Sequence, residues 1–491
     1  MLIKNLIKNI HVLEIINKQS NIDVKKIAYN SKNVQSDSLF VAILGYVTDG
    51  HHYIKNAIDQ GARIIVFQND LKDYDPQIMY IRVANSRLAL SLMASTFYGD
   101  PSKEFLITGI TGTNGKTSVS YMLKHLFEAN QKKCGLIGTI HNLIGETVLD
   151  NRGRTTPESL EIQETLRKMK AADCTYLSME VSSHALTLDR VNDVSFDYGI
   201  FTNLTQDHLD YHKTFENYFN AKSKLFFQVN KTNIINGDDP WGKILCHRLQ
   251  EKSNCKLITY GFLDHNNYVA KDMVYHKDGT TYTLVTPYGK EQIYCNIPGK
   301  FMVANSLPAI INALEEKIPM AVIKKAMGTL PVIEGRIESV KTDAPFDVII
   351  DYAHTPDGLE KLLQAVKTVY TGKLILVFGC MGDRDRVKRP MMGEIAGTYA
   401  DEIIVTSANP ASENPMSIID AAASGVKEKT SHYYKIARRD KSIYFATRLC
   451  HPGDVLVLAG KGHEKREILK DKTLYYNEWT TVKNAVKQLQ K

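Results

Sequence analysis

The chain has 491 residues, with 61 lysines and arginines against 54 aspartates and glutamates and a formal net charge of +7 at pH 7. This length exceeds what one hydrophobic core normally serves, so we expect about three domains. The basic residues are spread along the chain without a long basic tract, which argues against nucleic-acid binding and favours a small anionic substrate.

The beginning of the chain carries no pattern for export. Residues 1–10 are apolar at helical spacing but are interrupted by lysines, unlike the unbroken apolar core of a signal peptide. No later segment is long and apolar enough to cross a bilayer, and the seven cysteines form no C-x-x-C pair that would indicate a zinc site. We therefore expect a cytoplasmic protein without membrane insertion.

Residues 1–100 are predicted to form a first domain. Apolar runs at residues 38–43 and 62–67 are typical of buried strands, and residues 53–60 between them have helical spacing. The turn-forming sequence Gly99-Asp-Pro-Ser102 marks the end of this domain.

Residues 101–331 are predicted to form a central domain with a parallel sheet, because short apolar runs alternate there with helical patterns. The expected strands are residues 106–110, 135–140, 175–181, 199–204 and 232–236. Residues 270–298 alternate polar and apolar side chains around two turn signals, which predicts antiparallel strands flanking that sheet.

A glycine-rich run follows the first strand of the central domain and opens a helical pattern. It reads Gly112-Thr-Asn-Gly-Lys-Thr-Ser118, and its glycines would let the backbone wrap an anion at a helix N-terminus. Lys116 and Thr117 suit terminal phosphates and Mg²⁺. Ile110 stands where the strict G-x-x-x-x-G-K-[ST] pattern has its first glycine, but the context still predicts an ATP or GTP site.

Two later strands of the central domain end in groups that could bind a metal. Glu180 ends one strand, and Mg²⁺ prefers such hard oxygen ligands, although a turn-capping role stays open. Two histidines and two aspartates follow the next strand between Gln206 and His212, which favours His208 as a metal-site residue. Lys222 lies on a short amphipathic helix, and its spacing alone indicates a surface lysine.

Residues 332–491 repeat the alternation of strands and helices. The expected buried strands are residues 348–351, 374–379, 402–406 and 455–460, and each is followed by a polar loop. Loops at the carboxyl edge of a parallel sheet converge, so one shared ligand is favoured over four unrelated turns. The predicted fold class is α/β, with three domains: the central one has a P-loop-type ATPase parallel sheet and the C-terminal one is Rossmann-like.

Taken together, these motifs resemble the Mur ligase family, ATP-dependent amide-forming enzymes of peptidoglycan synthesis, and within it the tripeptide-forming members. The resemblance spans essentially the whole chain. The matching pieces, in order, are Asn30-Ser-Lys32, Leu39-Phe-Val-Ala42, Asp49-Gly-His51, Thr111 to Thr117, Thr155-Thr-Pro157, Glu180-Val-Ser-Ser-His184, Thr202 to His212, Asp351-Tyr-Ala-His-Thr-Pro356, Gly382-Asp-Arg-Asp385 and Gly460 to Glu464.

The resemblance implies a UDP-MurNAc-binding domain (1–100), an ATP-binding domain (101–331) and a C-terminal domain (332–491) that closes over ATP and amino acid. A carboxylate of UDP-MurNAc-L-Ala-D-Glu would attack the γ-phosphate of ATP, and a free amino acid would capture the acyl phosphate. Lys116, Thr117 and Mg²⁺ suit this reaction, because phosphoryl transfer depends on positioning and charge neutralisation. We expect a monomer.

The resemblance also implies roles residue by residue. Catalytic roles fall to Lys116, His208 and Lys222, and carbamylation of Lys222 to N6-carboxylysine replaces the surface-lysine interpretation. The expected ATP contacts are Gly112, Thr113, Asn114, Gly115, Lys116, Thr117, Ser118, Asn305, Arg336 and Asp351. Muramyl-peptide contacts are expected from Ser31, Thr155, Thr156, Ser182 and Arg190, amino-acid contacts from Arg384, Asn409, Gly460 and Glu464, and Mg²⁺ contacts from Thr117, Glu180, His208 and carbamylated Lys222.

One departure from the family pattern bears on the third amino acid. Residues 408–411 read Ala-Asn-Pro-Ala, where enzymes specific for meso-diaminopimelate carry Asp-Asn-Pro-Arg. Without that arginine the distal carboxylate of diaminopimelate lacks its bidentate partner, so L-lysine is expected. Ala408 also removes a carboxylate that could meet the lysine ammonium, which leaves diaminopimelate and L-ornithine open.

Two other functions compete with this interpretation. Folylpolyglutamate synthase shares the ATPase pattern but would not explain the uridine-type first domain. A non-catalytic, nucleotide-regulated scaffold for UDP-peptides is the alternative from another class. The joint presence of Lys116, Glu180, His208 and Lys222 argues against such a decayed site.

Overall fold

The computed structural model describes residues 1–19, 21–45, 48–149 and 153–489. Its packing divides the chain into two compact units. The first unit comprises Met1–Gly109, Lys132–Gly199 and Lys224–Lys231, and the second comprises Ile110–Gln131, Ile200–Ser223 and Thr232–Lys491.

A five-stranded sheet in the first unit has the order β1-β5-β4-β3-β2 and is parallel except for the antiparallel pair β1 and β5. Its side chains alternate: Leu39 and Val41 pack with residues of α1 and α3, whereas Phe40 packs with Ala57 of α2. The elements are α1 (Ile3–Leu6), β1 (Val12–Ile16), β2 (Lys26–Ala28), β3 (Ser38–Val41), α2 (Ile54–Asp59), β4 (Ala62–Phe67), β5 (Met79–Val83) and α3 (Ser86–Tyr98). The strands predicted at residues 38–43 and 62–67 and the helix between them are confirmed.

An eleven-stranded sheet follows, with the order β16-β15-β14-β13-β12-β11-β6-β10-β7-β8-β9. Its strands are β6 (Leu106–Thr111), β7 (Cys134–Ile137), β8 (Asn142–Ile144), β9 (Thr147–Leu149), β10 (Tyr176–Glu180), β11 (Phe196–Phe201), β12 (Val229–Asn236), β13 (Lys256–Gly261), β14 (Tyr268–His276), β15 (Gly279–Thr286) and β16 (Gly289–Cys295). Its helices are α4 (Lys116–Ala129), α5 (Ser159–Ala171), α6 (Ser183–Thr187), α7 (Leu209–His212), α8 (Phe215–Ser223), α9 (Pro240–Lys252), α10 (Lys300–Glu315) and α11 (Met320–Met327).

The five predicted strands of the central domain are present, but the edges of the sheet differ from the prediction. Residues 270–298 do form antiparallel strands, yet β14 pairs in parallel with β13, so these strands extend the sheet instead of flanking it. At the other edge, β8 and β9 add a short antiparallel hairpin. Strand β11 begins at Phe196, three residues before its predicted start, because Asp197 and Tyr198 already belong to its ladder.

The C-terminal part of the second unit is a doubly wound sheet with the order β17-β18-β22-β19-β20-β21, parallel except for β17. Its elements are β17 (Glu338–Ser339), β18 (Asp347–Asp351), α12 (Pro356–Val369), β19 (Leu374–Cys380), α13 (Lys388–Tyr399), β20 (Glu402–Ser407), α14 (Pro415–Lys427), β21 (Tyr433–Ile436), α15 (Arg439–Leu449), β22 (Val455–Ala459) and α16 (Glu478–Leu489). A separate hairpin pairs β23 (Arg466–Ile468) with β24 (Thr473–Tyr475).

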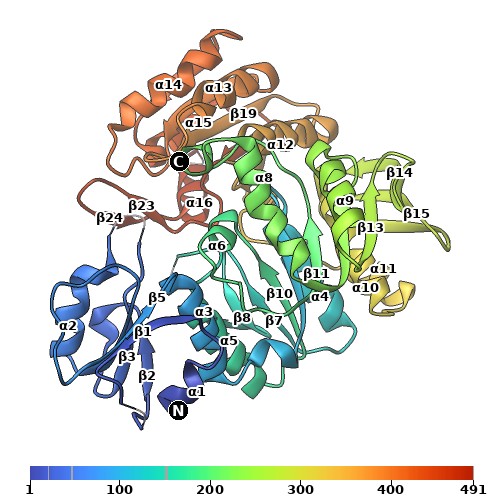
Figure 1. The fold of residues 1–491 in the computed structure, drawn as a ribbon. Coiled ribbons are helices and arrows are strands. Elements are labelled where there is room, and N and C mark those ends of the chain that lie inside the picture. Colours follow the sequence, from blue (N-terminus) through green and yellow to red (C-terminus); the bar gives the residue numbers. More distant parts are fainter. Residues whose placement is uncertain (20, 46–47, 150–152, 490–491) are drawn as a thin grey trace. The chain divides into compact units, whose positions relative to one another are not determined.

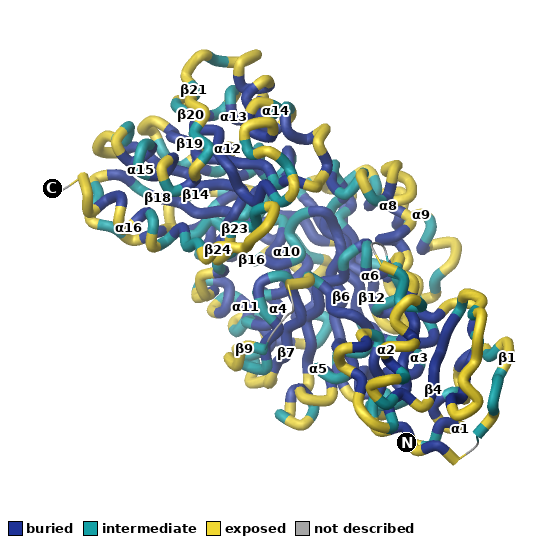
Figure 2. Tube along the Cα trace, turned by 90° about the vertical axis from the view of Figure 1, so that its left-hand side faces the viewer, coloured by how far each residue is buried: buried dark blue, intermediate teal, exposed yellow. Residues whose placement is uncertain are grey.

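Strand β19 explains why this sheet is covered on both faces. Leu376 and Phe378 belong to the cluster that includes side chains of α12, α13 and α14, whereas Ile375 and Val377 pack with side chains of α15 and α16. All seven residues of β19 are buried, and the strand lies among α12, α13, α14 and α15 in Figure 1 and is dark blue in Figure 2. A continuous apolar run of this kind is the mark of a parallel strand buried on both sides.

No helix in the described parts of the chain has both the length and the apolar character needed to span a membrane.

A buried ion pair joins α15 to α16. Arg439 Nε lies 2.6 Å from Glu478 Oε1, with side-chain exposures of 1% and 0%. Removing one partner leaves the other as an unpaired buried charge. Glu478→Gln is therefore expected to lower the free energy of unfolding by about 3–5 kcal/mol. The midpoint of urea unfolding would measure this loss, with Asp440→Asn at the exposed Arg438–Asp440 pair as the matched control. Equal midpoints for both variants would contradict the expectation.

Candidate active site

The glycine-rich run forms the turn between β6 and α4. Gly115 precedes the helix with φ of +91°, a conformation that favours glycine. A Cβ atom at this position would also lie 2.4 Å from Asn305 Oδ1. Lys116 begins the helix, and its Nζ donates to the carbonyl oxygens of Gly112 at 2.8 Å and Thr113 at 2.9 Å. The lysine therefore folds back over the loop where a phosphate would bind.

The segment after β11 holds this loop in place. The Thr113 N–H donates to Asn203 O at 2.9 Å, and the Asn114 N–H donates to Asn203 Oδ1 at 3.0 Å. Thr202 Oγ1 donates to Asn114 O at 2.6 Å. These bonds fix the backbone of the loop, so a phosphate would meet a cradle that is already formed.

Lys222 reaches the same loop from α8. Its Nζ donates to Gly112 O at 2.7 Å and lies 4.5 Å from the centre of the Tyr218 ring. Burial, and then the charge of Lys116, lower the pKa of Lys222 well below its usual range. The amines of Lys116 and Lys222 thus converge on one carbonyl oxygen, and Lys222 is not the surface residue that its spacing alone indicates.

His208 also packs against Tyr218. The two rings meet edge to face with centroids 6.3 Å apart, and the Tyr218 hydroxyl lies 3.3 Å from Thr113 Oγ1. Residue 208 has φ of +53°, which turns the chain into α7. The structure therefore brings His208 and Lys222 together around Tyr218, beside the glycine-rich loop.

A buried ion pair next to His208 was not predicted from the sequence. Lys388 Nζ lies 3.3 Å from Asp207 Oδ1, and both side chains are less than a tenth exposed. Burial opposes ionisation of Asp207, but Lys388, His208 and His354 together hold its pKa well below the usual range. The charge on Asp207 is therefore kept, and it fixes the loop that carries His208.

Three residues expected to contact adenosine lie in the second unit near the start of α4. Asn305 approaches Gly115, and Arg336 Nη2 donates to Thr117 Oγ1 at 3.3 Å. Asp351 is buried, which raises its pKa, and its two carboxylate oxygens accept from the backbone N–H groups of Ile337 and Ala353. Arg336 is thus tied to the first turn of α4, and Asp351 is held by the backbone around it.

The expected amino-acid residues gather where β18, β19, β20 and β22 end. Asn409 Nδ2 donates to Glu464 Oε2 at 2.5 Å, and Asn409 O accepts from the Gly382 N–H at 2.8 Å. Gly460 N–H donates to Asp351 O at 3.2 Å, and Arg384 is exposed in the loop after β19. The convergence of these loops at one carboxyl edge is confirmed.

Lys461 is a further charged group at this edge. Its Nζ donates to Asn409 Oδ1 at 3.0 Å, and burial lowers its pKa to about 8. Lys461 lies within the motif Gly460 to Glu464, but the sequence analysis predicted site roles only for Gly460 and Glu464.

Four residues expected to hold the muramyl peptide form one hydrogen-bonded group in the first unit. Thr156 Oγ1 donates to Glu180 O at 2.8 Å and accepts from the Ser182 N–H at 3.0 Å. Arg190 Nη1 donates to Thr156 O at 3.1 Å. Thr139, which the sequence did not single out, donates from its Oγ1 to Glu180 Oε2 at 2.9 Å, and the same oxygen lies 3.0 Å from Thr155 Oγ1.

Ser31 lies apart from this group in the chain. It begins a short 3₁₀ helix after β2 and is 6% exposed. The preceding Asn30 caps this turn by accepting from the Lys32 N–H at 3.1 Å. Asn30 therefore has a local structural role, and the expected contact of Ser31 with uridine stays a prediction.

The expected metal ligands offer one hydroxyl, one carboxylate, one imidazole and one lysine. Thr117, His208 and Lys222 belong to the second unit and Glu180 to the first. Among the residues that the structure describes, no three His, Cys, Asp or Glu side chains lie close enough to hold a metal. This donor set fits Mg²⁺ bound largely through waters and phosphate oxygens, as Mg²⁺ usually is.

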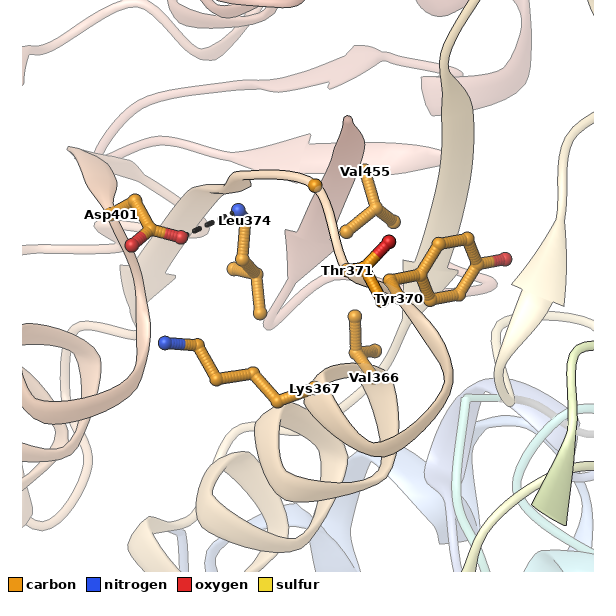
Figure 3. A pocket seen from close by; sticks show the side chains of 8 residues that line it. Val366, Lys367, Tyr370, Thr371, Leu374, Asp401 and Val455 are labelled. Carbon is orange, nitrogen blue, oxygen red and sulfur yellow. Dashed lines mark hydrogen bonds between the residues drawn. The ribbon is translucent and has the colours of Figure 1, made fainter. Parts of the chain in front are cut away.

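A pocket of about 230 Å³ lies at the opposite edge of the C-terminal sheet (Figure 3). It is lined at the amino ends of β19 and β22, where Asp401 accepts a hydrogen bond from the Leu374 N–H at 2.8 Å. None of the expected site residues lines it, and chemistry in parallel α/β sheets takes place at the carboxyl edge. It therefore belongs to the packing of α12 against the sheet.

Comparisons with known proteins identify the family of this chain. The Mur ligase family, catalytic domain, matches residues 23–98, the Mur ligase middle domain matches 110–313, and the Mur ligase glutamate ligase domain matches 335–462. A UDP-N-acetylmuramoyl-L-alanyl-D-glutamate–2,6-diaminopimelate ligase of Clostridium botulinum is 44% identical over 96% of this chain and 97% of its own. The enzyme of that name from Clostridium tetani is 42% identical over the whole of both chains.

A solved structure of a ligase with the same name covers 100% of this chain and 99% of its own, with 27% identity and a TM-score of 0.70. This similarity extends over all three predicted domains and agrees with the predicted α/β class. Because relatives above 40% identity span nearly the whole sequence, the chain belongs to the Mur ligase family.

Proposed function

We propose that this protein is an ATP-dependent ligase that joins a third amino acid to UDP-MurNAc-L-Ala-D-Glu in peptidoglycan synthesis. The observation that carries the proposal is the convergence of Lys116 and Lys222 on Gly112 O in a glycine-rich loop. Lys116 and the helix N-terminus would neutralise the γ-phosphate while the dipeptide carboxylate attacks it. The amino group of the third amino acid then displaces phosphate from the acyl phosphate.

Carbamylation of Lys222 is part of this proposal. Lys222 is 2% exposed, and this burial lowers the pKa of its amine, which favours the neutral form that can react with CO₂. The reaction forms an N–C bond and releases one proton, which turns the amine into a carboxylate-like group. Thr117, His208 and modified Lys222, all in the second unit, would then offer ligands to Mg²⁺, which supplies charge neutralisation when bound.

For the third amino acid we propose meso-diaminopimelate. The relatives reported above bear the name of diaminopimelate ligases, and L-lysine finds no support among them. The surroundings of Asn409 hold charges of both signs, because Lys461 Nζ lies 3.9 Å from Glu464 Oε2 and Lys465 pairs with Glu334. The choice of amino acid therefore rests on the relatives.

Phosphate release from ATP in the presence of UDP-MurNAc-L-Ala-D-Glu and Mg²⁺ tests this proposal. Release is expected to require the dipeptide and to be stimulated at least tenfold more by meso-diaminopimelate than by L-lysine or L-ornithine, about 1.4 kcal/mol of discrimination. Stimulation by lysine alone would contradict the proposed amino acid. Release without the dipeptide would instead favour a nucleotide-driven scaffold over a ligase.

The domain boundaries at residues 100 and 331, a monomeric state and a cytoplasmic location remain predictions. The first two are accessible to limited proteolysis and to sedimentation of the whole chain.

A further inference from the structure

A buried carboxylate that the proposed mechanism does not use lies beside the expected substrate arginine. Glu158 stands directly before α5 and is 4% exposed, yet its side chain does not cap that helix. Instead, Arg190 Nε lies 2.9 Å from Glu158 Oε1, and Arg154 Nη1 donates to the same oxygen at 3.1 Å. The second oxygen accepts from Arg87 Nη1 at 3.4 Å. Three guanidinium groups therefore share one carboxylate.

The cluster contains a second carboxylate and leaves its arginines partly exposed. Glu161, one turn into α5, supplies a second carboxylate, which accepts from the Tyr29 hydroxyl. Burial, with Arg154 and Arg87, lowers the pKa of Arg190, whereas Glu158 raises it. The side chains of Arg87 and Arg190 are each 13% exposed and that of Arg154 is 45% exposed, so guanidinium groups of this cluster remain accessible to an anionic group of the substrate.

Glu158 also helps to orient the guanidinium group of Arg190. Its Nε lies 2.9 Å from the carboxylate without forming a hydrogen bond, and its Nη1 donates to Thr156 O at 3.1 Å, so one ion pair and one hydrogen bond hold the guanidinium. Thr156 is in turn hydrogen-bonded to Glu180 O and to the Ser182 N–H. Arg190 is therefore connected through Thr156 to another residue expected to bind the substrate, Ser182. A side chain fixed in this way loses little entropy when it binds a carboxylate.

The same carboxylate reaches the five-stranded sheet. Arg87 lies in the first turn of α3, and its Nε donates to Leu44 O at 3.0 Å. Asn85, the residue that caps α3, donates to Asp189 Oδ2 at 2.9 Å, and Asp189 immediately precedes Arg190 in the chain. Two contacts thus join the start of α3 to the segment that carries Arg190.

From these contacts we infer that Glu158 is a positioning residue, which holds Arg190 as the clamp for the non-reacting carboxylate of the UDP-MurNAc dipeptide. The inference rests on the proposed function. Without the charge of Glu158, three arginines would repel one another and Arg190 would turn away from Thr156. The effect would fall on dipeptide binding and leave the ATP half of the site as it is.

The test compares Glu158→Gln with wild type on two substrates: the dipeptide, and the same dipeptide with its non-reacting carboxylate amidated. We expect E158Q to raise the KM for the dipeptide about tenfold or more, with kcat and the KM for ATP changed less than about threefold. Wild type should discriminate against the amidated substrate, and E158Q should lose most of that discrimination. Glu158→Asp, which keeps the charge, should restore part of it.

Glu164→Gln is the matched control, because Glu164 lies on the same helix and pairs with Lys168 at the surface. It should retain both the KM and the discrimination of wild type. If E158Q keeps wild-type discrimination, the cluster is only structural and the inference fails. If E158Q does not fold, the same comparison is made between Glu158→Ala and Glu158→Asp. Equal discrimination by these two variants would overturn the inference, because only the aspartate keeps the charge. A wild-type enzyme without dipeptide-dependent phosphate release would instead overturn the proposed function.

Discussion

Replacing Lys116 with alanine is expected to lower dipeptide-dependent phosphate release by at least about a hundredfold, since one preorganised charge at the reacting phosphate is lost. The lysine begins α4 and folds back onto Gly112 O and Thr113 O, so its ammonium already lies over the loop before ATP binds. Phosphoryl transfer offers the protein little covalent chemistry, and charge at the phosphate is its main contribution. The loss should therefore appear in kcat as well as in the KM for ATP.

Phosphate release under saturating ATP, dipeptide and amino acid would measure this effect. Lys132→Ala is a suitable control, because that lysine is exposed in the turn before β7. Thermal unfolding of both variants would show whether the fold is intact. Turnover of Lys116→Ala within about threefold of wild type would rule out the proposed role of the loop.

Replacing Lys222 with alanine is expected to lower turnover by about a hundredfold or more and to make it respond to added short carboxylates such as formate or acetate. The alanine variant leaves a gap beside Gly112 O where the buried side chain lay. A small carboxylate that enters this gap can offer the oxygen atoms that a carbamate would have placed there. Lys224→Ala is the control, because Lys224 lies two residues away and is exposed. This variant should keep wild-type turnover and should not respond to added carboxylates.

Carbamylation itself can be followed without turnover. Wild-type protein equilibrated with ¹³C-bicarbonate should show a carbamate carbon resonance that is missing in Lys222→Ala. A fully active Lys222→Ala variant, or an active wild-type enzyme without the resonance, would contradict the modification. Loss of activity that no carboxylate restores, in a folded variant, would point to the amine itself as the working group.

The sequence allowed the phosphate loop and the carboxyl-edge loops to be predicted because both depend on local patterns. A glycine-rich turn between an apolar strand and a helix has few other uses, and parallel strands such as β19 are apolar throughout. The edges of the sheets were harder, since β8 and β9 have only three residues each and pair with a neighbour by backbone alone. Such strands leave almost no periodic signal.

The residues that support the site were the least predictable. Glu158 and Arg87 are 71 positions apart, and Lys388 and Asp207 are 181 apart, so only the folded chain reveals that they meet. Lys222 illustrates the same limit, because its burial comes from the packing of α8 against the phosphate loop and not from its own helix. The family resemblance could assign a role to Lys222, but the spacing of residues along its helix could not predict that it is buried.

The outer strand β16 has a consequence for the protein at high concentration. A strand that ends a sheet offers unpaired N–H and C=O groups, and a second molecule could add its own strand there. Lys290 and Glu291 stand on this strand, and Lys324 of α11 lies 2.7 Å from Glu291. A chain that docked edge to edge would have to desolvate these charges, which disfavours pairing with a second molecule at this edge of the sheet.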